Sequence, residues 1–160
     1  MVDGMKIRKA TINDLDEIVK LDNFGEEILD KGSDMDRLDK EYRKKNGTVE
    51  YHKKYIVGRN KWCLVAEKND KVIGFLTFKI KKREPYLKLK VAGYLDLIVI
   101  YKKYRHKGVS KQLFDEAYKI LKSKGIGYIE ASVQHENLIA RNAWKKAGFK
   151  DYRIYIWKKI

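Results

Sequence analysis

Apolar residues recur at helical spacing in the first part of the chain. A short strand pattern at residues 6–11 (KIRKAT) precedes them. The apolar stripe that follows consists of Leu15, Ile18, Val19 and Leu21. Thr11 or Asn13 can cap such a helix with its side-chain oxygen, and Gly32 is expected to end it. The pattern therefore predicts one strand and one amphipathic helix in this region.

A second helical pattern begins at Ser33 and is interrupted by Gly47, after which a further stretch runs to Gly58. The apolar positions of these two segments are Met35, Leu38, Tyr42, Val49, Tyr55 and Ile56. They recur at the spacing of helix faces. We therefore expect two or three helices in residues 1–60.

The pattern changes to strands at Trp62. Residues 62–82 form two β-rich runs around Asn69-Asp70, a pair of residues typical of a tight hairpin turn. Residues 93–101 (GYLDLIVIY) are apolar enough for a central strand that is covered on both faces. An antiparallel hairpin beside a central strand is therefore expected.

An amphipathic helix follows the central strand and ends near Gly125. Its apolar positions are Val109, Leu113, Ala117, Ile120 and Leu121. Residues 128–133 (YIEASV) then form a strand, Asn137 caps a helix that stops at Gly148, and residues 151–157 (DYRIYIW) form a closing strand. Strand, helix and strand in this order place the first two strands in parallel, so the sheet should be mixed.

Length and composition indicate one compact domain, residues 1–160. Hydrophobic residues make up 44% of the chain. No apolar run approaches the ~18 residues of a membrane-spanning helix. The single cysteine, Cys63, cannot form an internal disulfide, and residues 1–11 lack the apolar stretch of a secretion signal. We therefore expect a soluble, cytoplasmic protein with no membrane partner.

The net charge of +15 is unevenly distributed. Residues 1–60 are balanced, with 13 Lys+Arg and 13 Asp+Glu, so the whole excess lies in residues 61–160. A basic region of this kind favours a polyanionic partner, and one interpretation is a nucleic-acid- or ribosome-associated protein. Residues 22–41, in contrast, hold eight acids and three bases. This acidic segment either attracts a cationic molecule or is a solvated charged face.

The turn after the central strand is suited to anion binding. Residues 105–110 (RHKGVS) stand at the start of the amphipathic helix, where backbone N–H groups lack partners and the helix dipole is positive. Gly108 allows a positive φ or a close approach, and Ser110 is small. Basic side chains surround them at Arg105, Lys107 and Lys111. The turn suits a pyrophosphate, although the nucleotide-binding patterns GxxxxGK[ST] and GxGxxG are absent.

The same turn resembles the acetyl-CoA signature of the GNAT superfamily of N-acyltransferases, [Q/R]-x-x-G-x-[G/A], with Ser110 at the last position. A second family pattern, N-x-x-A-x-x-x-Y-x-x-x-G-F, is met in the following helix by Asn137, Ala140, Trp144, Gly148 and Phe149. Two residues depart from the family, because Lys102 replaces a usual proline and Trp144 replaces a usual tyrosine. The order of the expected elements is also similar to that of the family.

The resemblance implies a GNAT-like α/β (α+β) fold. In this fold a mixed, mostly antiparallel sheet with a central parallel strand pair is flanked by helices. It also implies an acetyl-CoA-dependent N-acetyltransferase that moves the acetyl group to a primary amine by direct attack in a ternary complex. The implied acceptor is a small cationic amine, a lysine side chain or a peptide N-terminus, bordered by the early helices.

The resemblance further assigns contacts to the cofactor. The pyrophosphate of acetyl-CoA is expected at Arg105, His106, Lys107, Gly108, Val109, Ser110 and Lys111. The pantetheine arm would pair like an extra strand with the backbone of Ile98 and Ile100. Asn137 would contact the same arm. Trp144 lies on this cofactor-side helix, where core packing is the plainer role.

Asp96 and Tyr94 are the expected catalytic residues. Asp96 is the only acid in the central strand, and a carboxylate in an apolar run needs a partner or a function. Strand alternation would place Tyr94, Asp96, Ile98 and Ile100 on one face. Asp96 is then a general base or an amine-binding group, or it forms an ion pair with a neighbouring lysine. Tyr94, Tyr101 or water could protonate the departing thiolate, or the thiolate could leave without a proton donor. A backbone N–H near Ile100 could bind the oxyanion.

Three further expectations complete the interpretation. Because the family's usual tyrosine is absent, a CoA-binding module without turnover is an alternative to an enzyme. No His, Cys, Asp or Glu cluster has the spacing of metal ligands, so no metal is expected, and Cys63 should be a small buried side chain. An open sheet edge could be covered by a second subunit or protected by Lys158 and Lys159, which leaves monomer and homodimer as alternatives.

Overall fold

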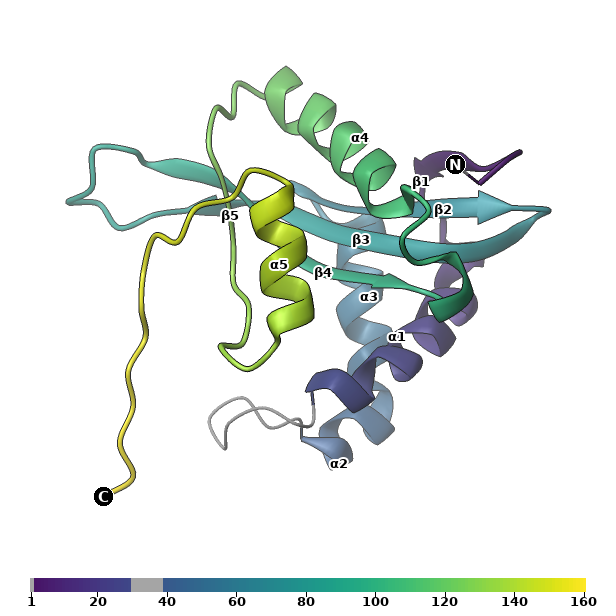
Figure 1. Cartoon of the computed structure of the whole chain (residues 1–160), viewed down its shortest axis with the longest axis horizontal. Coiled ribbons are helices and arrows are strands. Elements are labelled where there is room, and N and C mark those ends of the chain that lie inside the picture. Colours follow the sequence, from purple (N-terminus) through teal and green to yellow (C-terminus); the bar gives the residue numbers. More distant parts are fainter. Residues whose placement is uncertain (1, 30–38) are drawn as a thin grey trace.

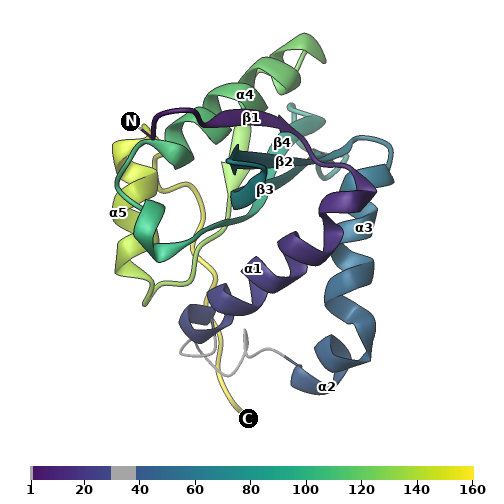
Figure 2. The same ribbon diagram turned by 90° about the vertical axis from the view of Figure 1, so that its right-hand side faces the viewer.

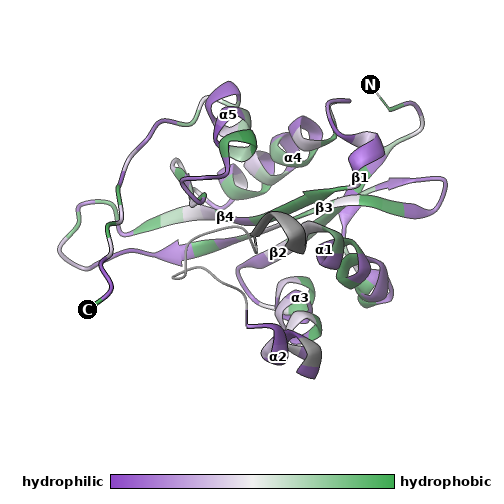
Figure 3. Ribbon diagram, turned by 60° about the horizontal axis from the view of Figure 1, so that its bottom comes forward, coloured by the Kyte–Doolittle hydropathy of each residue, from purple (hydrophilic) through white to green (hydrophobic). Residues whose placement is uncertain are grey.

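The computed structural model describes residues 2–29 and 39–160, without the side chains of residues 26–29 and 44. In this part of the chain a five-stranded sheet separates two groups of helices (Figure 1). One face carries α1 (Leu15–Leu29) and α3 (Thr48–Val57), and the other carries α4 (Val109–Ser123) and α5 (Leu138–Lys146) (Figure 3). The predicted fold class, a mixed sheet flanked by helices, is confirmed.

The strands follow one another across the sheet in chain order. They are β1 (Lys6–Lys9), β2 (Lys61–Lys68), β3 (Lys71–Lys82), β4 (Val91–Ile100) and β5 (Ile129–Ala131). The first three junctions are antiparallel, whereas β4 and β5 are parallel because α4 connects them. Asn69 and Asp70 have φ values of 49° and 57°, which suit a tight hairpin turn between β2 and β3. The predicted hairpin and parallel pair are therefore confirmed.

The start of α1 is tied to the sheet by charged side chains. The Asp14 carboxylate accepts from the backbone N–H of Thr11 at 2.7 Å and from its hydroxyl at 3.0 Å. Arg8 of β1 donates to both oxygens of this carboxylate, at 2.8 and 2.7 Å, and also bonds to Glu67 of β2. The Arg8 guanidinium lowers the pKa of Asp14 from 3.8 to about 2. Thr11, one of the two predicted caps, is therefore the N-cap of the short helical turn Ile12–Asp14 that leads into α1.

Residues 39–57 form α2 (Lys40–Tyr42), a wider turn η3 (Arg43–Gly47) and α3. Asp39 caps α2 by accepting from the backbone N–H of Tyr42 at 2.9 Å. The chain kinks just before Gly47, at Asn46, whose φ is 68°. α1 and α3 pack side by side on the same side of the sheet (Figure 2). The predicted helix start at Ser33 lies outside the described residues.

Each face of the sheet has its own apolar core (Figure 3). The core toward α4 includes Leu64, Leu76, Phe78, Leu95, Val109, Leu113 and Leu121. The core toward α1 and α3 includes Ile18, Leu21, Tyr55, Val65, Phe75 and Val99. β4 contributes to both cores, as its apolar sequence predicts. None of the helices in the described residues combines the length and the apolar character that a bilayer crossing would need.

The predicted closing strand at residues 151–157 is wrong. Residues 149–160 have no regular secondary structure, and from the end of α5 the chain runs away from the body of the molecule (Figure 1). The side chains from Lys150 onward are exposed, with 54% of Trp157 and 91% of Ile156 accessible to solvent. An alternating apolar pattern forms a strand only where a sheet edge pairs with it, and the path of this segment leads away from the sheet.

Candidate active site

β4 contains a β-bulge at Asp96. Thr77 of β3 pairs with Leu97, and the next residue of β3, Phe78, pairs with Leu95. Asp96 is therefore an extra residue without a partner on β3. A bulge of this kind bends the strand and shifts the alternation of its side chains by one position.

The bulge changes which side chains of β4 share a face. Asp96 hydrogen-bonds to Tyr55 of α3, so it lies on the face that α1 and α3 cover. Ile98 and Ile100 instead pack against the core toward α4. The prediction that Tyr94, Asp96, Ile98 and Ile100 share one face is wrong for the two isoleucines. Strict alternation fails where one residue is inserted into the strand.

The outer edge of β4 is open beyond Leu95, the last residue of its parallel ladder with β5. The N–H of Tyr101 bonds to the carbonyl of Ile73 in β3 at 3.1 Å. Because backbone groups alternate in direction along an antiparallel strand, those of Ile98 and Ile100 point away from β3. Their N–H and C=O groups therefore face the gap between β4 and β5.

Two left-handed residues shape the turn before α4, His106 with a φ of 61° and Gly108 with a φ of 81°. No side chain caps α4, and its first backbone bond runs from the N–H of Gln112 to the carbonyl of Gly108 at 3.2 Å. The N–H groups of residues 109–111 therefore have no acceptor within the helix. They lie at the positive end of the helix dipole, an arrangement that binds anions.

The basic side chains of this turn lie in different surroundings. Arg105 is half-buried, and its Nε donates to the carbonyl of Ile100 at 2.9 Å, which ties the turn to the end of β4. Lys107 is exposed beside the helix start. Lys111 is also exposed, and it pairs with Asp115 one helical turn later at 2.6 Å. Lys107 and Lys111 thus present their charge to solvent, whereas Arg105 holds the turn in place.

α5 contributes Asn137 and Trp144. The Asn137 Oδ1 accepts from the backbone N–H of Ala140 at 3.0 Å, so this side chain caps the helix as predicted. The Trp144 ring stacks on Phe114 of α4 with centroids 5.1 Å apart, and it meets Phe149 edge-on at 4.9 Å. Trp144 therefore packs between α4 and the end of α5. This is core packing, the plainer role that the sequence analysis expects for it.

Asp96 lies in a hydrogen-bonded cluster. Its Oδ2 accepts a short hydrogen bond from the Tyr55 hydroxyl and pairs with the Lys79 Nζ at 2.7 Å. The Lys79 ammonium also lies 5.1 Å from the centroid of the Tyr94 ring. The Tyr94 hydroxyl is 2.6 Å from the Oγ of Ser132, which follows β5. The lysine ion pair, which the sequence left as an alternative for Asp96, is therefore present together with a tyrosine donor.

The cluster extends along α3 to Tyr51, whose ring centroid is 5.0 Å from that of Tyr55. The Tyr51 hydroxyl lies 3.4 Å from the Oγ1 of Thr77. Burial raises the pKa of Tyr51, and burial together with the bond to Asp96 raises the pKa of Tyr55. Both hydroxyls therefore keep their protons at neutral pH. Neither tyrosine was predicted as a site residue, although their spacing of four residues places them on one helix face.

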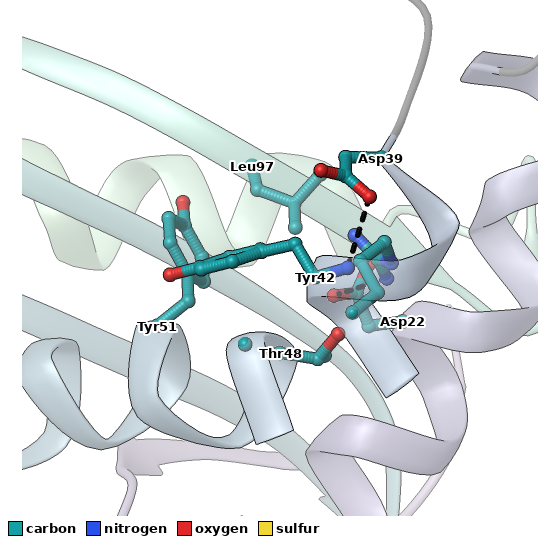
Figure 4. Close-up of a pocket in the computed structure, with 8 residues that line it drawn as sticks. Asp22, Asp39, Tyr42, Thr48, Tyr51 and Leu97 are labelled. Carbon is teal, nitrogen blue, oxygen red and sulfur yellow. Dashed lines mark hydrogen bonds and ion pairs between the residues drawn. The ribbon is translucent and has the colours of Figure 1, made fainter. Parts of the chain in front are cut away.

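A pocket of about 220 Å³ lies among α1, α2, α3 and β4 (Figure 4). It is lined by Asp22, Asp39, Tyr42, Arg43, Gly47, Thr48, Tyr51 and Leu97. Figure 4 shows the Tyr42 side chain extending toward Tyr51. Leu97 is next to Asp96 in the chain, and Tyr51 contacts Tyr55. This end of the pocket therefore adjoins the Asp96 cluster.

Two carboxylates border the pocket with different partners. Asp22 is buried, and its carboxylate bonds to Arg43 at 3.2 Å and to the Nε2 of His52 at 2.9 Å. Asp39 is exposed and caps α2. Asp22 is thus engaged inside the protein, whereas Asp39 presents charge to solvent. Other acids of the predicted acidic segment, among them Asp30, Asp34 and Asp36, lie outside the described residues.

The described part of the chain has no site for metal binding or for thiol chemistry. No three His, Cys, Asp or Glu side chains there are grouped to hold a metal ion. Cys63 is 2% exposed, and burial raises its pKa to about 12. Its thiol therefore stays protonated, and Cys63 is the small buried side chain that the sequence predicts.

Residues 29–149 match the model of the acetyltransferase (GNAT) family. The chain belongs to this family. The match spans the turn before α4, the open edge of β4 and the α5 helix. The GNAT family is a family of acetyltransferases.

One curated relative is N-alpha-acetyltransferase 30 of Schizosaccharomyces pombe, which is 27% identical over 95 residues. The match covers 59% of this chain and 61% of the relative. The chain therefore aligns with under two thirds of the relative's length.

Solved structures resemble the chain over nearly its whole length. The BH1408 protein from Bacillus halodurans has a TM-score of 0.80 at 16% identity and covers 97% of this chain and 99% of its own. The aminoglycoside N-acetyltransferase AAC(6')-Iy in complex with CoA has a TM-score of 0.76 at 18% identity, with coverages of 97% and 94%. The aminoglycoside 6'-N-acetyltransferase AAC(6')-Ih from Acinetobacter baumannii has a TM-score of 0.77 at 16% sequence identity. The match covers 98% of this chain and 99% of that protein. These likenesses establish the GNAT fold.

Proposed function

We propose that this protein transfers the acetyl group of acetyl-CoA to a primary amine within a ternary complex. The observation that carries the proposal is the gap between β4 and β5, where the backbone groups of Ile98 and Ile100 point outward beside Asp96. The family supports the cofactor, since AAC(6')-Iy is similar in fold and was solved with CoA. A cofactor arm, a carboxylate and a pocket for the acceptor then meet at one point of β4.

The cofactor would be held at two places. The pyrophosphate of acetyl-CoA would accept from the N–H groups of residues 109–111, with Lys107 and Lys111 adding charge. Together with His106 and Gly108, these residues form the turn that the family pattern assigns to this group. Val109 is buried in the core toward α4, which fixes the helix start against the sheet.

The pantetheine arm would then run along the open edge of β4. Ile98 offers both its N–H and its carbonyl, whereas the carbonyl of Ile100 already accepts from Arg105. The contribution of Ile100 is therefore chiefly its N–H. Asn137 of α5 is assigned to the same arm by the family pattern, in addition to its role as a helix cap.

The acceptor amine would occupy the pocket beside α2 and α3. Asp39 supplies an exposed carboxylate, and Tyr42 and Tyr51 supply aromatic rings, a combination that attracts an ammonium group. The pocket ends at Leu97, next to Asp96. A cationic amine would thus approach the thioester from one face of the sheet, and the pyrophosphate would be held on the opposite face. The named relatives agree with an amine acceptor, being an N-alpha-acetyltransferase and aminoglycoside acetyltransferases.

Transfer requires a neutral amine, a stabilised oxyanion and a proton for the thiolate. Asp96 would accept a proton from the bound ammonium, directly or through water. The amine nitrogen would then attack the thioester carbon, and the resulting oxyanion would be bound by the outward N–H of Ile98 or Ile100. The carbon–sulfur bond breaks as the carbonyl reforms, and the departing thiolate takes a proton from the Tyr94 hydroxyl. The nitrogen, which carries one extra proton after the attack, releases it to water, and Tyr94 regains a proton from water.

Tyr55 and Lys79 act as positioning residues in this scheme. Both donate to the Oδ2 of Asp96, so they fix the direction of the carboxylate without contacting the substrate. The bulge turns Asp96 to the face that α1 and α3 cover, where the acceptor would bind, while the backbone groups of Ile98 face the gap where the cofactor arm would lie. This division lets one strand serve both substrates.

Two binding titrations and one activity assay test the proposal. The protein is titrated with CoA, titrated with RNA over a range of salt concentrations, and assayed with acetyl-CoA against polyamines, aminoglycosides, lysine peptides and peptide N-termini. Micromolar CoA binding with transfer to at least one amine supports the proposal. Strongly salt-dependent RNA binding without CoA binding supports a nucleic-acid-binding protein instead. CoA binding without transfer to any amine supports a module that binds CoA without turnover.

A further inference from the structure

Lys79 of β3 brings an amine of the protein itself to the carboxylate that would activate the acceptor. Its Nζ lies 2.7 Å from the Oδ2 of Asp96. The amine of a bound acceptor would have to come to the same carboxylate, because Asp96 is the proposed proton acceptor. Lys79 therefore meets the first requirement of an acceptor, which is a base within hydrogen-bond reach of its nitrogen.

The Lys79 ammonium also lies beside the proposed proton donor. Lys79 and Tyr94 are paired residues of β3 and β4, so their side chains share one face of the sheet. The Lys79 Nζ is 5.1 Å from the centroid of the Tyr94 ring. The Tyr94 hydroxyl is 2.6 Å from the Oγ of Ser132, which follows β5 at the point where β4 and β5 part. Tyr94 thus extends toward the gap in which the thioester would lie.

The surroundings of Lys79 hold its ammonium near Asp96 and still leave it accessible. The centroid of the Tyr55 ring lies 5.8 Å from the Lys79 Nζ, so two aromatic rings and a carboxylate attract this cation. The side chain of Lys79 is 30% exposed, and that of Asp96 is 22% exposed. The nitrogen is therefore held in one place without being sealed inside the protein.

We propose that Lys79 is a self-acetylation site, which takes the acetyl group of acetyl-CoA bound to the same chain when no amine acceptor is present. This inference rests on the proposed function, because it uses the same cofactor, the same base and the same acid. It adds a modification site at a residue that otherwise only positions Asp96.

The reaction at Lys79 follows the steps of transfer to a free amine. Asp96 takes one proton from the Lys79 ammonium, and the neutral nitrogen attacks the thioester carbon. The carbon–sulfur bond breaks, the CoA thiolate takes a proton from the Tyr94 hydroxyl, and the nitrogen releases its second proton to water. Water then takes the proton of Asp96 and returns one to Tyr94. The products are acetyl-Lys79 and CoA.

Acetylation changes the charge of the cluster around Asp96. The Lys79 ammonium becomes a neutral amide, which cannot form an ion pair with the carboxylate. The hydrogen bond from Tyr55 to Asp96 does not involve Lys79 and remains. Self-acetylation thus couples the charge beside the base to the supply of acetyl-CoA.

Mass spectrometry of the full chain tests the proposal, after incubation with isotope-labelled acetyl-CoA and no amine. Proteolytic peptides give the labelled fraction of each lysine over time. We expect Lys79 to be labelled faster than Lys119 of α4. Lys119 also pairs with a carboxylate, Glu116 at 3.2 Å, and its side chain is 74% exposed. It therefore reports the direct chemical reaction of acetyl-CoA with a surface lysine.

Lys81 is the control nearest to the site. Its Nζ lies 4.7 Å from the centroid of the same Tyr94 ring, but it pairs with Glu130 at 3.2 Å. Its side chain is 47% exposed, more than that of Lys79. Faster labelling of Lys79 than of Lys81 therefore cannot come from exposure or from the aromatic neighbour, and it identifies the contact with Asp96 as the cause.

Two variants separate self-acetylation from chemical acetylation. Asp96→Asn should slow the labelling of Lys79 by ~100-fold or more and leave that of Lys119 unchanged. Lys79→Arg keeps a cation beside Asp96 but has no primary amine, so only the label at residue 79 should disappear. Both variants should keep the circular dichroism and the Kd for CoA of the wild-type protein. Acetyl-Lys79 already present on purification counts equally if Asp96→Asn lacks it.

Dilution of the protein at constant acetyl-CoA shows whether the reaction stays within one chain. The labelled fraction of Lys79 at a given time should not change on dilution. A rate that rises with protein concentration overturns the proposal. Labelling of Lys79 that is no faster than that of Lys119 or Lys81, or that Asp96→Asn leaves unchanged, overturns it as well.

The CoA titration and the amine panel distinguish failure of this inference from failure of the proposed function. A chain that binds CoA and acetylates an amine, but leaves Lys79 unmodified, retains the proposed function and loses the self-acetylation site. A chain that does not bind CoA loses both.

Discussion

The Tyr55 hydroxyl of α3 donates a hydrogen bond to the Asp96 carboxylate at the bulge of β4. A residue 41 positions away in the chain thus fixes the direction of this carboxylate. If Asp96 accepts the proton of the acceptor amine, Asp96→Asn should lower kcat by ~100-fold or more. The Kd for CoA should not change, because the proposed cofactor contacts come from the backbone of β4 and from the turn before α4, and not from the Asp96 carboxylate. Steady-state kinetics and calorimetric titration with CoA measure the two quantities. Unchanged kcat would remove Asp96 from the mechanism.

Tyr55→Phe should lower kcat roughly tenfold, since a hydrogen bond to a charged group contributes about 1.5–3 kcal/mol. The phenylalanine ring preserves packing, and KM for the acceptor should move little because Tyr55 is assigned to Asp96 alone. Tyr51→Phe is the matched comparison, because the Tyr51 hydroxyl contacts Thr77 at 3.4 Å and reaches Asp96 only through Tyr55. Equal losses in both variants, with equal shifts in Tm, would mean that the tyrosines act through packing only.

Asp39→Asn should raise KM for a cationic acceptor by roughly two- to fivefold, the effect of one exposed charge. kcat should be unchanged. Asparagine caps helices as well as aspartate does, so α2 keeps its first turn. Asp16→Asn, in the first turn of α1 and exposed, is the control for a general loss of negative charge. Equal KM values for all three proteins would show that the pocket does not attract the amine through Asp39.

Gly108→Ala should weaken CoA binding about fivefold or more. No atom lies within 4 Å of the added Cβ, so the effect comes from the backbone, where a φ of +81° costs an alanine about 1–2 kcal/mol. Gly127→Ala is matched to it, because no atom lies within 4 Å there either and Gly127 has no positive φ. Calorimetric Kd values for CoA compare the two variants. A larger loss at Gly127 would argue against a role for the left-handed turn.

The Arg8–Asp14 contact should make stability sensitive to acid. Arg8 lowers the pKa of Asp14 from 3.8 to about 2 in the folded protein. A carboxyl with a lowered folded pKa stabilises the fold above its unfolded pKa and loses this contribution as pH falls through the folded value. The shift corresponds to about 2 kcal/mol at neutral pH, which should fade between about pH 4 and pH 2.

Urea unfolding of the wild-type protein and of Asp14→Asn measures this contribution. The two free energies of unfolding should differ at neutral pH and converge toward pH 2. A difference that stays constant over this range would assign the loss to the helix cap at Thr11 and not to the charge of Asp14.

Much of the fold could be predicted from the sequence because it depends on near neighbours. The apolar spacing of residues 109–121 is enough to define α4, and Asn69-Asp70 is enough to define the turn of the hairpin. The same holds for two parts of the candidate site. Gly108 stands at the start of a helix that no side chain caps, and Asp96 is the only acid of an apolar strand. Both residues can therefore be recognised from the sequence without knowing their neighbours in the fold.

The tertiary structure alone decided the rest, because it depends on partners that are distant in the chain. The bulge at Asp96 follows from the register between β3 and β4, and it moves Ile98 and Ile100 to the opposite face. Tyr55 becomes a site residue only because α3 packs over that bulge. Residues 151–157 have the pattern of a strand, but a strand needs a sheet edge within reach. Local pattern thus determined the elements and the chemical groups, whereas long-range pairing decided which faces and edges those groups meet.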